Sequence, residues 1–109
     1  MAAFQIVTPA KFCQMALVPA ITLAYTVPGN MVAYLKDIDI PNTTGAPIAV
    51  TVYIGNGTGP SNVLIPNITI PANSIFQWTG TQILNTGDTI QAIAAALGCN
   101  LIASGATAV

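Results

Sequence analysis

The sequence predicts an all-β protein: a single antiparallel β-sandwich of about seven or eight strands with an extended N-terminal arm. Three observations lead to this expectation. Turn signals built from Gly, Pro and Asn recur at short intervals along the 109 residues. Between these turns, apolar residues recur at a period of two, which is typical of strands with one buried face. The length suits one compact domain, and a hydrophobic content of 53% is enough for its core.

Each expected strand follows a turn. The segment 31–40 follows Pro-Gly-Asn, and its expected apolar face consists of Val32, Tyr34, Ile38 and Ile40. Asp37 and Asp39 would then lie together on the opposite face. The segment 47–54 follows Asn-Thr-Thr-Gly and alternates strictly, with an apolar face formed by Ile48, Val50, Val52 and Ile54.

The second half of the chain continues the pattern. After the Gly-rich segment 55–60, which we interpret as a hairpin loop, the segment 63–70 places Leu64, Ile68 and Ile70 together. Phe76 and Trp78 share a face in the next strand. The segment 90–96 is apolar on both faces, and its Ala-rich end also resembles a helical turn. We expect a strand, because the tract is short and lies between two turn signals.

The N-terminal segment differs from the rest. Residues 1–15 show no clear period and precede the first regular strand, so we expect an arm there and the sandwich domain over residues 16–109. Such an arm can pack on a neighbouring subunit, and its candidate interface residues are Phe4, Ile6, Val7 and Phe12. The alternative is a frayed terminus without a role.

The chain carries very little charge. Its charged residues, 5% of the total, are Lys11, Lys36, Asp37, Asp39 and Asp88, with a net charge of -1. Such a chain has no long-range field to attract nucleic acid or an anionic membrane. The mean hydropathy of +0.70 requires that lipid or other subunits cover apolar surface. A spanning helix needs about 20 apolar residues, and Pro19, Pro28 and Gly29 interrupt the best segment. We therefore expect self-association and no membrane partner.

The sequence contains few of the side chains that catalysis or metal binding usually requires. The sequence contains no His, so a nucleophile would have no ordinary base. Asp37 and Asp39 could act as an acid–base pair or bind calcium, but two solvated carboxylates beside Lys36 are the simpler interpretation. The spacing of Cys13 and Cys99 matches no metal motif. They could form one disulfide, or be two buried thiols. We expect no enzyme activity, no cofactor and no bound metal.

The order of motifs resembles a known group of proteins. A Tyr-Thr-Val-Pro-Gly segment at residues 25–29 precedes Val-Ala-Tyr-Leu-Lys-Asp-Ile-Asp-Ile and Asn-Thr-Thr-Gly-Ala. Ile-Pro-Ala-Asn-Ser, Phe-Gln-Trp-Thr-Gly and Leu-Asn-Thr-Gly-Asp-Thr-Ile-Gln-Ala follow. Over residues 23–105 this looks like the small β-sandwich structural proteins of tailed bacteriophages, which include capsid decoration (cement), head-fibre and tail accessory proteins. The group commonly has Val-Pro-Ala-Gly where this chain has Val-Pro-Gly-Asn.

This resemblance implies a structural role in a virion. The leading hypothesis is a decoration protein that binds and stabilises the shell as a homo-oligomer, expected to be a trimer. Its other partners would be the major capsid protein or other virion proteins, after assembly in the host cytoplasm, and its clamp would be the N-terminal arm. Whether the sandwich is a jelly roll or immunoglobulin-like stays open.

The same residues allow two other functions. The first is a receptor- or glycan-binding module of a head fibre, spike or tail, which would use loop 55–60 and exposed aromatic residues such as Trp78 and Tyr53. Only 6% of residues are aromatic, however, and Trp78 shares its face with Phe76, which favours core packing. The second is a membrane-active protein, which the interrupted apolar segments disfavour.

Overall fold

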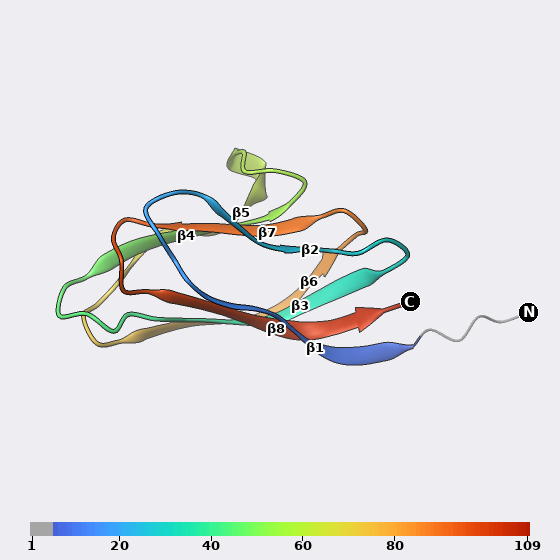
Figure 1. The fold of residues 1–109 in the computed structure, drawn as a ribbon, viewed down its shortest axis with the longest axis horizontal. Coiled ribbons are helices and arrows are strands. Elements are labelled where there is room, and N and C mark those ends of the chain that lie inside the picture. The colour runs from blue at the N-terminus through green and yellow to red at the C-terminus, as the bar shows by residue number, and fades with distance from the viewer. Residues whose placement is uncertain (1–5) are drawn as a thin grey trace, which may run out of the picture.

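Eight strands form two four-stranded antiparallel sheets that face each other in the computed structural model, which describes residues 6–109 (Figure 1). The strands are β1 (Val7–Ala16), β2 (Thr22–Thr26), β3 (Val32–Pro41), β4 (Ile48–Gly55), β5 (Val63–Ile70), β6 (Ile75–Leu84), β7 (Thr89–Ala94) and β8 (Asn100–Ala108). A short 3-10 turn, η1 (Pro60–Asn62), precedes β5. The expected all-β class and sandwich-like arrangement are confirmed.

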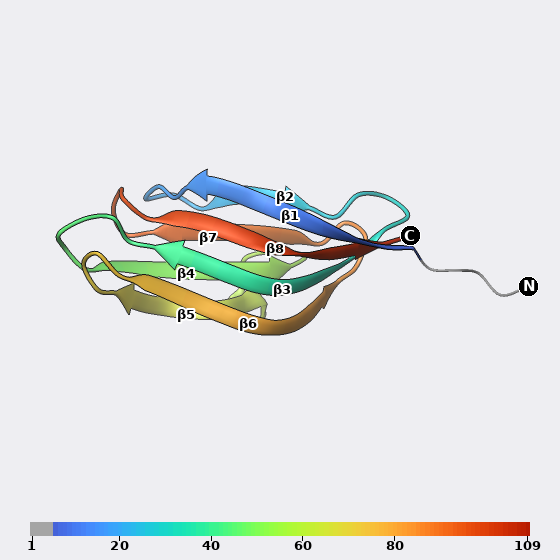
Figure 2. The same ribbon diagram turned by 90° about the horizontal axis from the view of Figure 1, so that it is seen from below.

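The strand pairing follows a simple rule. One sheet has the order β1-β8-β3-β6 and the other β2-β7-β4-β5. The first strand pairs with the last, the second with the seventh, the third with the sixth and the fourth with the fifth. Additional pairing of β3 with β8 and of β4 with β7 completes the sheets. As a result, β8 lies between β1 and β3 in the middle of its sheet (Figure 2).

The core lies between the sheets and follows the alternation of the strands. In β4 the residues Ile48, Val50 and Val52 are buried, as the sequence predicts, while the residues between them are partly exposed. In β7 the alternation is equally regular, so the strand interpretation is confirmed for residues 90–94, whereas Ala95 and Ala96 lie in a bend beyond the strand. The largest fully buried side chains are Leu17, Leu35, Ile38, Ile40, Ile65, Ile70, Leu84, Ile90, Leu101, Val27, Val50 and Val52.

β3 corrects one predicted face. Its pairing register with β6 and with β8 shifts between Leu35 and Asp37, so an irregularity lies at Lys36. Such a bulge reverses the facing of every residue on one side of it. Consequently Leu35, rather than Tyr34, is fully buried with Ile38, and the predicted inward positions of Val32 and Tyr34 are wrong. Burial alternates strictly on each side of the bulge but with opposite phase, and after the bulge Asp37 and Asp39 do share the outer face.

β5 departs from the expected pattern for the same reason. Its register with β4 shifts twice, between Val50 and Val52 and between Val52 and Tyr53. Ile70 is buried as predicted, but Ile65 is the second fully buried residue, and Leu64 is only partly buried.

β1 corrects the expected N-terminal arm. Residues 7–16 pair with β8 in an antiparallel ladder that runs from Val7 opposite Ala108 to Ala16 opposite Asn100. The predicted boundary between residues 15 and 16 therefore does not separate an arm from the sandwich, because most of the expected arm is a sheet strand. Residues 1–5, including Phe4, lie outside the described part of the chain.

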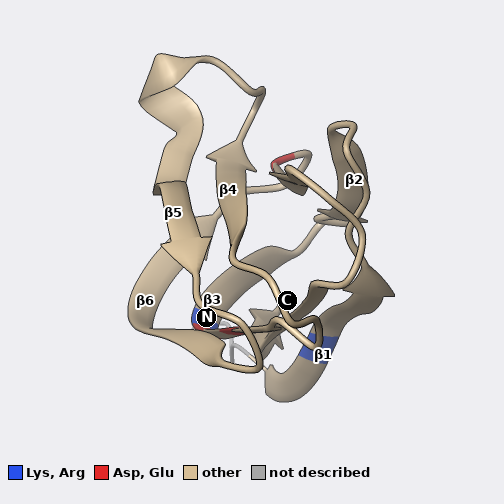
Figure 3. Cartoon of the chain, turned by 90° about the vertical axis from the view of Figure 1, so that its left-hand side faces the viewer, with Lys and Arg blue, Asp and Glu red and all other residues tan. Residues whose placement is uncertain are grey.

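The two lateral sides of the sandwich differ. β1 and β2 lie at one side, and β5 and β6 lie at the other (Figure 3). On the β1–β2 side the rings of Phe12 and Tyr25 contact each other with centroids 4.7 Å apart, which joins the two sheets. On the opposite side Phe76 and Trp78 pack against the core from β6 but remain partly exposed.

Asn42 forms a corner that ties the two sheets together. It follows β3 and is only 2% exposed. Its Nδ2 group lies 2.8 Å from the carbonyl oxygen of Ala46, 3.0 Å from that of Ile70 and 3.2 Å from that of Pro71. Its Oδ1 accepts hydrogen bonds from the backbone N–H and the hydroxyl of Thr44, at 3.0 and 2.7 Å. Since Ile70 ends β5, this one side chain connects an end of each sheet.

Candidate functional site

The charged side chains gather on one sheet. Lys11 lies on β1, and Lys36, Asp37 and Asp39 lie on β3, whereas β2, β4, β5 and β7 contain no charged residue (Figure 3). The fifth charge, Asp88, precedes β7, where its Oδ2 accepts a hydrogen bond from the backbone N–H of Asn85 at 2.9 Å. The outer face of the β2-β7-β4-β5 sheet is therefore uncharged.

Asp37 and Asp39 form a pair on the outer face of β3. Burial and the neighbouring charge of Asp39 raise the pKa of Asp37, and so does a hydrogen bond between the two side chains. Oδ1 of Asp39 is buried without a hydrogen-bond partner. Within residues 6–109 no third carboxylate, cysteine or histidine joins them in a metal-binding group. Two carboxylates supply only a small part of the roughly six to eight oxygen ligands that calcium takes.

The two cysteines are free thiols. Cys99 is fully buried, and Cys13 is partly buried on β1, with its Sγ 4.0 Å from the carbonyl oxygen of Leu101. Burial raises the pKa of both thiols. The sequence left open whether Cys13 and Cys99 form a disulfide or are two buried thiols, and in the structure they are two unpaired thiols in apolar surroundings. A neutral buried thiol is a poor nucleophile, so neither residue offers catalytic chemistry.

An apolar surface lies at the end of the molecule where the described chain begins and ends. The ladder places Val7 in one row with Ala108 and Val32, and Pro9 in the next row with Ala106, Tyr34 and Ile83. Next to them, the backbone N–H of Val109 bonds to the carbonyl oxygen of Ile6 at 3.2 Å. We call the exposed apolar residues at this end the terminal patch; they are Ile6, Val7, Ile83 and Val109, each 56 to 65% exposed, with Val7 and Ile83 on one face of the sheet.

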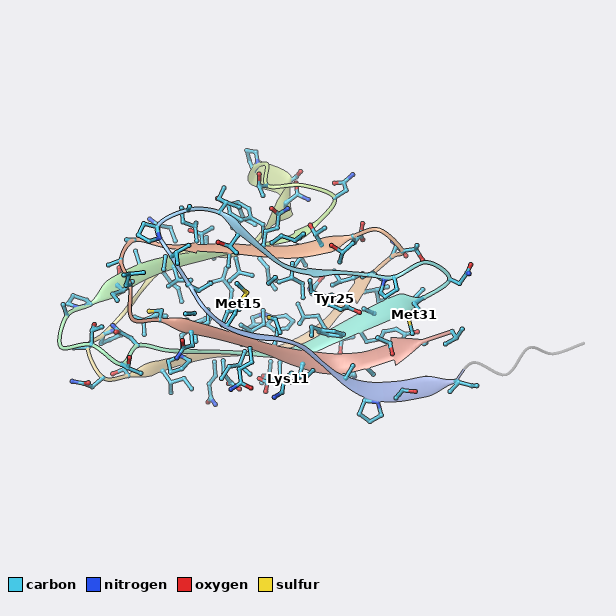
Figure 4. The ribbon with its side chains drawn as sticks, in the orientation of Figure 1. Lys11, Met15, Tyr25 and Met31 are labelled. Atoms are coloured by element: carbon cyan, nitrogen blue, oxygen red, sulfur yellow. The ribbon has the colours of Figure 1, made fainter. Side chains whose placement is uncertain are left out.

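The structure separates the four predicted interface residues. Ile6 and Val7 belong to the terminal patch, whereas Phe4 lies outside the described residues. Phe12 is only 7% exposed and packs on Tyr25, so its prediction as an interface residue is wrong. Phe12 continues the inward-facing phase of Ala10, and the shift in the ladder between Lys11 and Cys13 brings Cys13 to the same face. Figure 4 shows Tyr25, the ring on which Phe12 packs, between the sheets, and Lys11 outside them.

Sequence reasoning missed part of the terminal patch and of the rows around it. Val32 and Tyr34 were assigned to the core, because an unbroken period of two places them there, and Ile83 was assigned to no face. The available signal was Lys36, a charge in an otherwise apolar row. A charged residue that interrupts such a row indicates a bulge, and a bulge at this position turns Tyr34 outwards.

The two aromatic residues considered for a sugar platform lie on different sheets. Trp78 packs against the core from β6, while Tyr53 lies on β4, opposite Val63 of β5 and Gln91 of β7. Core packing of Trp78 is thus confirmed, and the two rings do not form one surface.

The loop before β5 is held by Asn62. Its Nδ2 donates to the carbonyl oxygen of Ile54 at 3.0 Å, and its Oδ1 accepts from the backbone N–H of Gly59 at 3.2 Å. Loop and turn project from the uncharged sheet (Figure 1). A separate open depression of about 410 Å³ lies at the Asn42 corner, lined by Pro41, Asn42, Thr43, Asn73, Ser74 and Ile75. None of these six side chains titrates near neutral pH, so the depression offers no acid–base chemistry.

Comparisons with known proteins add no relative. No protein-family model, no curated protein and no solved structure matches this chain. Across residues 6–109, no helix has the length and apolar character needed to cross a membrane. A functional argument therefore depends on the strand order and on the surfaces described above.

Proposed function

We propose that the chain is a structural protein of a tailed-bacteriophage virion: a capsid decoration (cement) protein that binds the shell as a homo-oligomer. The observation that carries this proposal is the strand order, 1-8-3-6 facing 2-7-4-5. Paired in this way, the chain is one long hairpin folded over itself, which supports a jelly roll over an immunoglobulin-like sandwich. In the latter, strands one, two, five and four form one sheet. Jelly rolls recur in viral capsid proteins.

The surface properties agree with a subunit that is buried in an assembly. One sheet has an uncharged outer face, and the terminal patch exposes several large apolar side chains. Monomeric soluble proteins rarely expose large contiguous apolar surfaces. In this proposal the terminal patch replaces the expected arm as the attachment surface. Ile6 and Val7 keep their predicted role and are joined by Ile83 and Val109. Each contact is weak, and repeated copies on one oligomer multiply the attachment.

Substitutions in the terminal patch test the attachment without disturbing the core. Val7→Asp and Ile83→Asp place a charge on exposed positions in two different strands. Thr69→Asp, which adds the same charge to an exposed position of β5, is the matched control. Binding is measured by co-sedimentation with purified empty shells of the phage that encodes the chain. We expect wild type and Thr69→Asp to saturate the shells, and each patch variant to bind about tenfold more weakly.

Three outcomes would count against these ideas. Absence of the protein from purified virions, or no co-sedimentation of the wild type, would refute the decoration role. Unchanged binding of both patch variants would refute the terminal patch as the attachment surface. Saturable binding to host-cell polysaccharide without shell binding would favour the receptor- or glycan-binding module instead. Jelly rolls also include lectin domains, and loop 55–60 would be its first candidate contact.

A further inference from the structure

The four edge strands of the sandwich are not equally protected. The unpaired backbone groups of an edge strand can pair with a strand of another chain, and proteins usually guard them with proline, charge, bulges or short length. β1 contains Pro9, Lys11 and a register shift. β2 has only five residues and a register shift, and β5 contains Pro66 and two register shifts. Three edges are thus guarded by two or more of these features.

β6 is the exception. It has ten residues and contains neither proline nor a charged residue. Its single register shift lies beyond Thr79, so residues 75–79 keep an unbroken ladder with residues 37–41 of β3. In the described part of the chain, no turn or loop makes a backbone hydrogen bond to residues 75–84. One side of this five-residue run is therefore free to accept another strand.

The side chains of the same run are incompletely covered. Phe76 and Trp78 point towards the core but remain partly exposed, at the lateral side where, among residues 6–109, no ring pair like Phe12 and Tyr25 joins the sheets. A strand added to β6 would satisfy the free backbone groups and cover both aromatic rings. Figure 3 shows β6 at this open side, next to β5.

We propose that two copies of this chain associate by antiparallel pairing of β6 with β6, with the two-fold axis at Gln77. In this register Phe76 of each copy lies opposite Trp78 of the other, and Ile75 lies opposite Thr79. Aromatic pairs across antiparallel strands are stabilising. Only Gln77 faces its own counterpart, and as an uncharged amide it causes no repulsion. The run is therefore complementary to itself.

The other edges favour this two-fold contact over a head-to-tail one. A ring or a filament would require β6 to pair with a different edge of the next copy, and all of those are guarded. The resulting dimer has one continuous sheet of two β1-β8-β3-β6 halves. This contact gives a dimer in place of the trimer expected from the resemblance. It deepens the homo-oligomer of the proposed function, but its test needs no shell, so either proposal can fail while the other holds.

Charge substitutions at Gln77 test the pairing. Gln77→Lys and Gln77→Glu each place like charges opposite each other at the axis, which is destabilising in antiparallel pairs. Thr69→Lys, on the exposed face of the guarded β5 edge, is the matched control. Mass is measured by analytical ultracentrifugation over a range of concentrations. The emission of Trp78, the only tryptophan, reports burial of its ring on association. Circular dichroism verifies that each variant is folded.

We expect wild type and Thr69→Lys to form dimers with the same dissociation constant. Each Gln77 variant alone should raise that constant about tenfold. An equimolar mixture of Gln77→Lys and Gln77→Glu should restore the dimer, because opposite charges then meet at the axis. A wild type that is monomeric at about 0.1 mM would overturn the proposal. An oligomer of any mass, a trimer included, that both Gln77 variants retain unchanged would overturn it as well.

Discussion

Replacing Asn42 with alanine should cost this small domain much of its stability. The Asn42 side chain contacts five polar groups within 3.2 Å, but its amide has only two hydrogens, so at most two of the three carbonyls are bonded at once. Four hydrogen bonds at a net value of about 1 kcal/mol each, partly replaced by water at the exposed end, give a loss of about 3 kcal/mol. Small domains are stable by only about 5 to 15 kcal/mol.

Urea unfolding followed by Trp78 fluorescence measures this loss. The expected result is a lower midpoint with an unchanged slope, because the amount of surface exposed on unfolding stays nearly the same. For a domain of this size, about 3 kcal/mol corresponds to a melting temperature roughly 15 °C lower. Asn56→Ala, an exposed loop position, is the matched control and should change stability by less than about 0.5 kcal/mol.

A second variant separates the donor from the acceptor. Asn42→Asp keeps the size of the side chain and the oxygen that accepts from Thr44, but directs a second oxygen at the carbonyl groups of Ala46 and Ile70. At neutral pH it should be at least as destabilising as alanine, because a buried charge faces two acceptors. If Asn42→Ala were within about 1 kcal/mol of the wild type, the argument that this corner joins the two sheets would be wrong.

Three further predictions follow from the packing. Phe12→Ala should lower the unfolding free energy by about 3 kcal/mol in the same urea assay, because it removes a core ring that contacts Tyr25. A loss below about 1 kcal/mol would contradict the assignment of Phe12 to the core. The pKa of Asp37 is raised in the folded state above its ordinary value of 3.8. Its protonated form therefore stabilises the fold below pH 3.8, and this stabilisation is lost as the pH rises through the higher pKa of the folded state. Asp37→Asn should remove that part of the pH dependence, and an unchanged profile of melting temperature against pH would contradict the assignment. Gly105→Ala would place a Cβ atom directly against the backbone carbonyl oxygen of Tyr34, so we expect a loss of about 3 kcal/mol or more, or no folded protein on expression. A wild-type melting temperature would refute this.

The sequence predicts the strands better than their faces. The strict alternation of residues 47–54 leads directly to β4, because its pairing with β7 is regular and the extra residues in its pairing with β5 lie on β5. In β3 the same reasoning fails at Lys36, since one extra residue reverses the facing of Tyr34 and Leu35. Periodicity describes a strand against an ideal partner, whereas a bulge is a property of the pair and depends on a strand far away in the chain.

The site was predicted less well for a related reason. The exposed apolar positions Ile6 and Val7 were found from composition alone, but Ile83 joins them only through the ladder between β3 and β6. Phe12 was misplaced because residues 7–15 seemed to lack a period, when in fact a shift beside Phe12 interrupts it. The common orientation of Asp37 and Asp39 was predicted correctly, since no irregularity lies between them.

The position of β8 has a consequence for biosynthesis. Residues 100–108 leave the ribosome after all the other strands, yet they occupy the space between β1 and β3, so one sheet cannot close until they have emerged. Until then β1 has no partner in its sheet, and β3 has only β6. A topology with such distant pairings folds slowly, and unpaired strands are prone to aggregate in the meantime. Removal of residues from the end of β8 should therefore leave β1 and β3 without part of their pairing, whereas residues joined after Val109 would leave every described strand its partner.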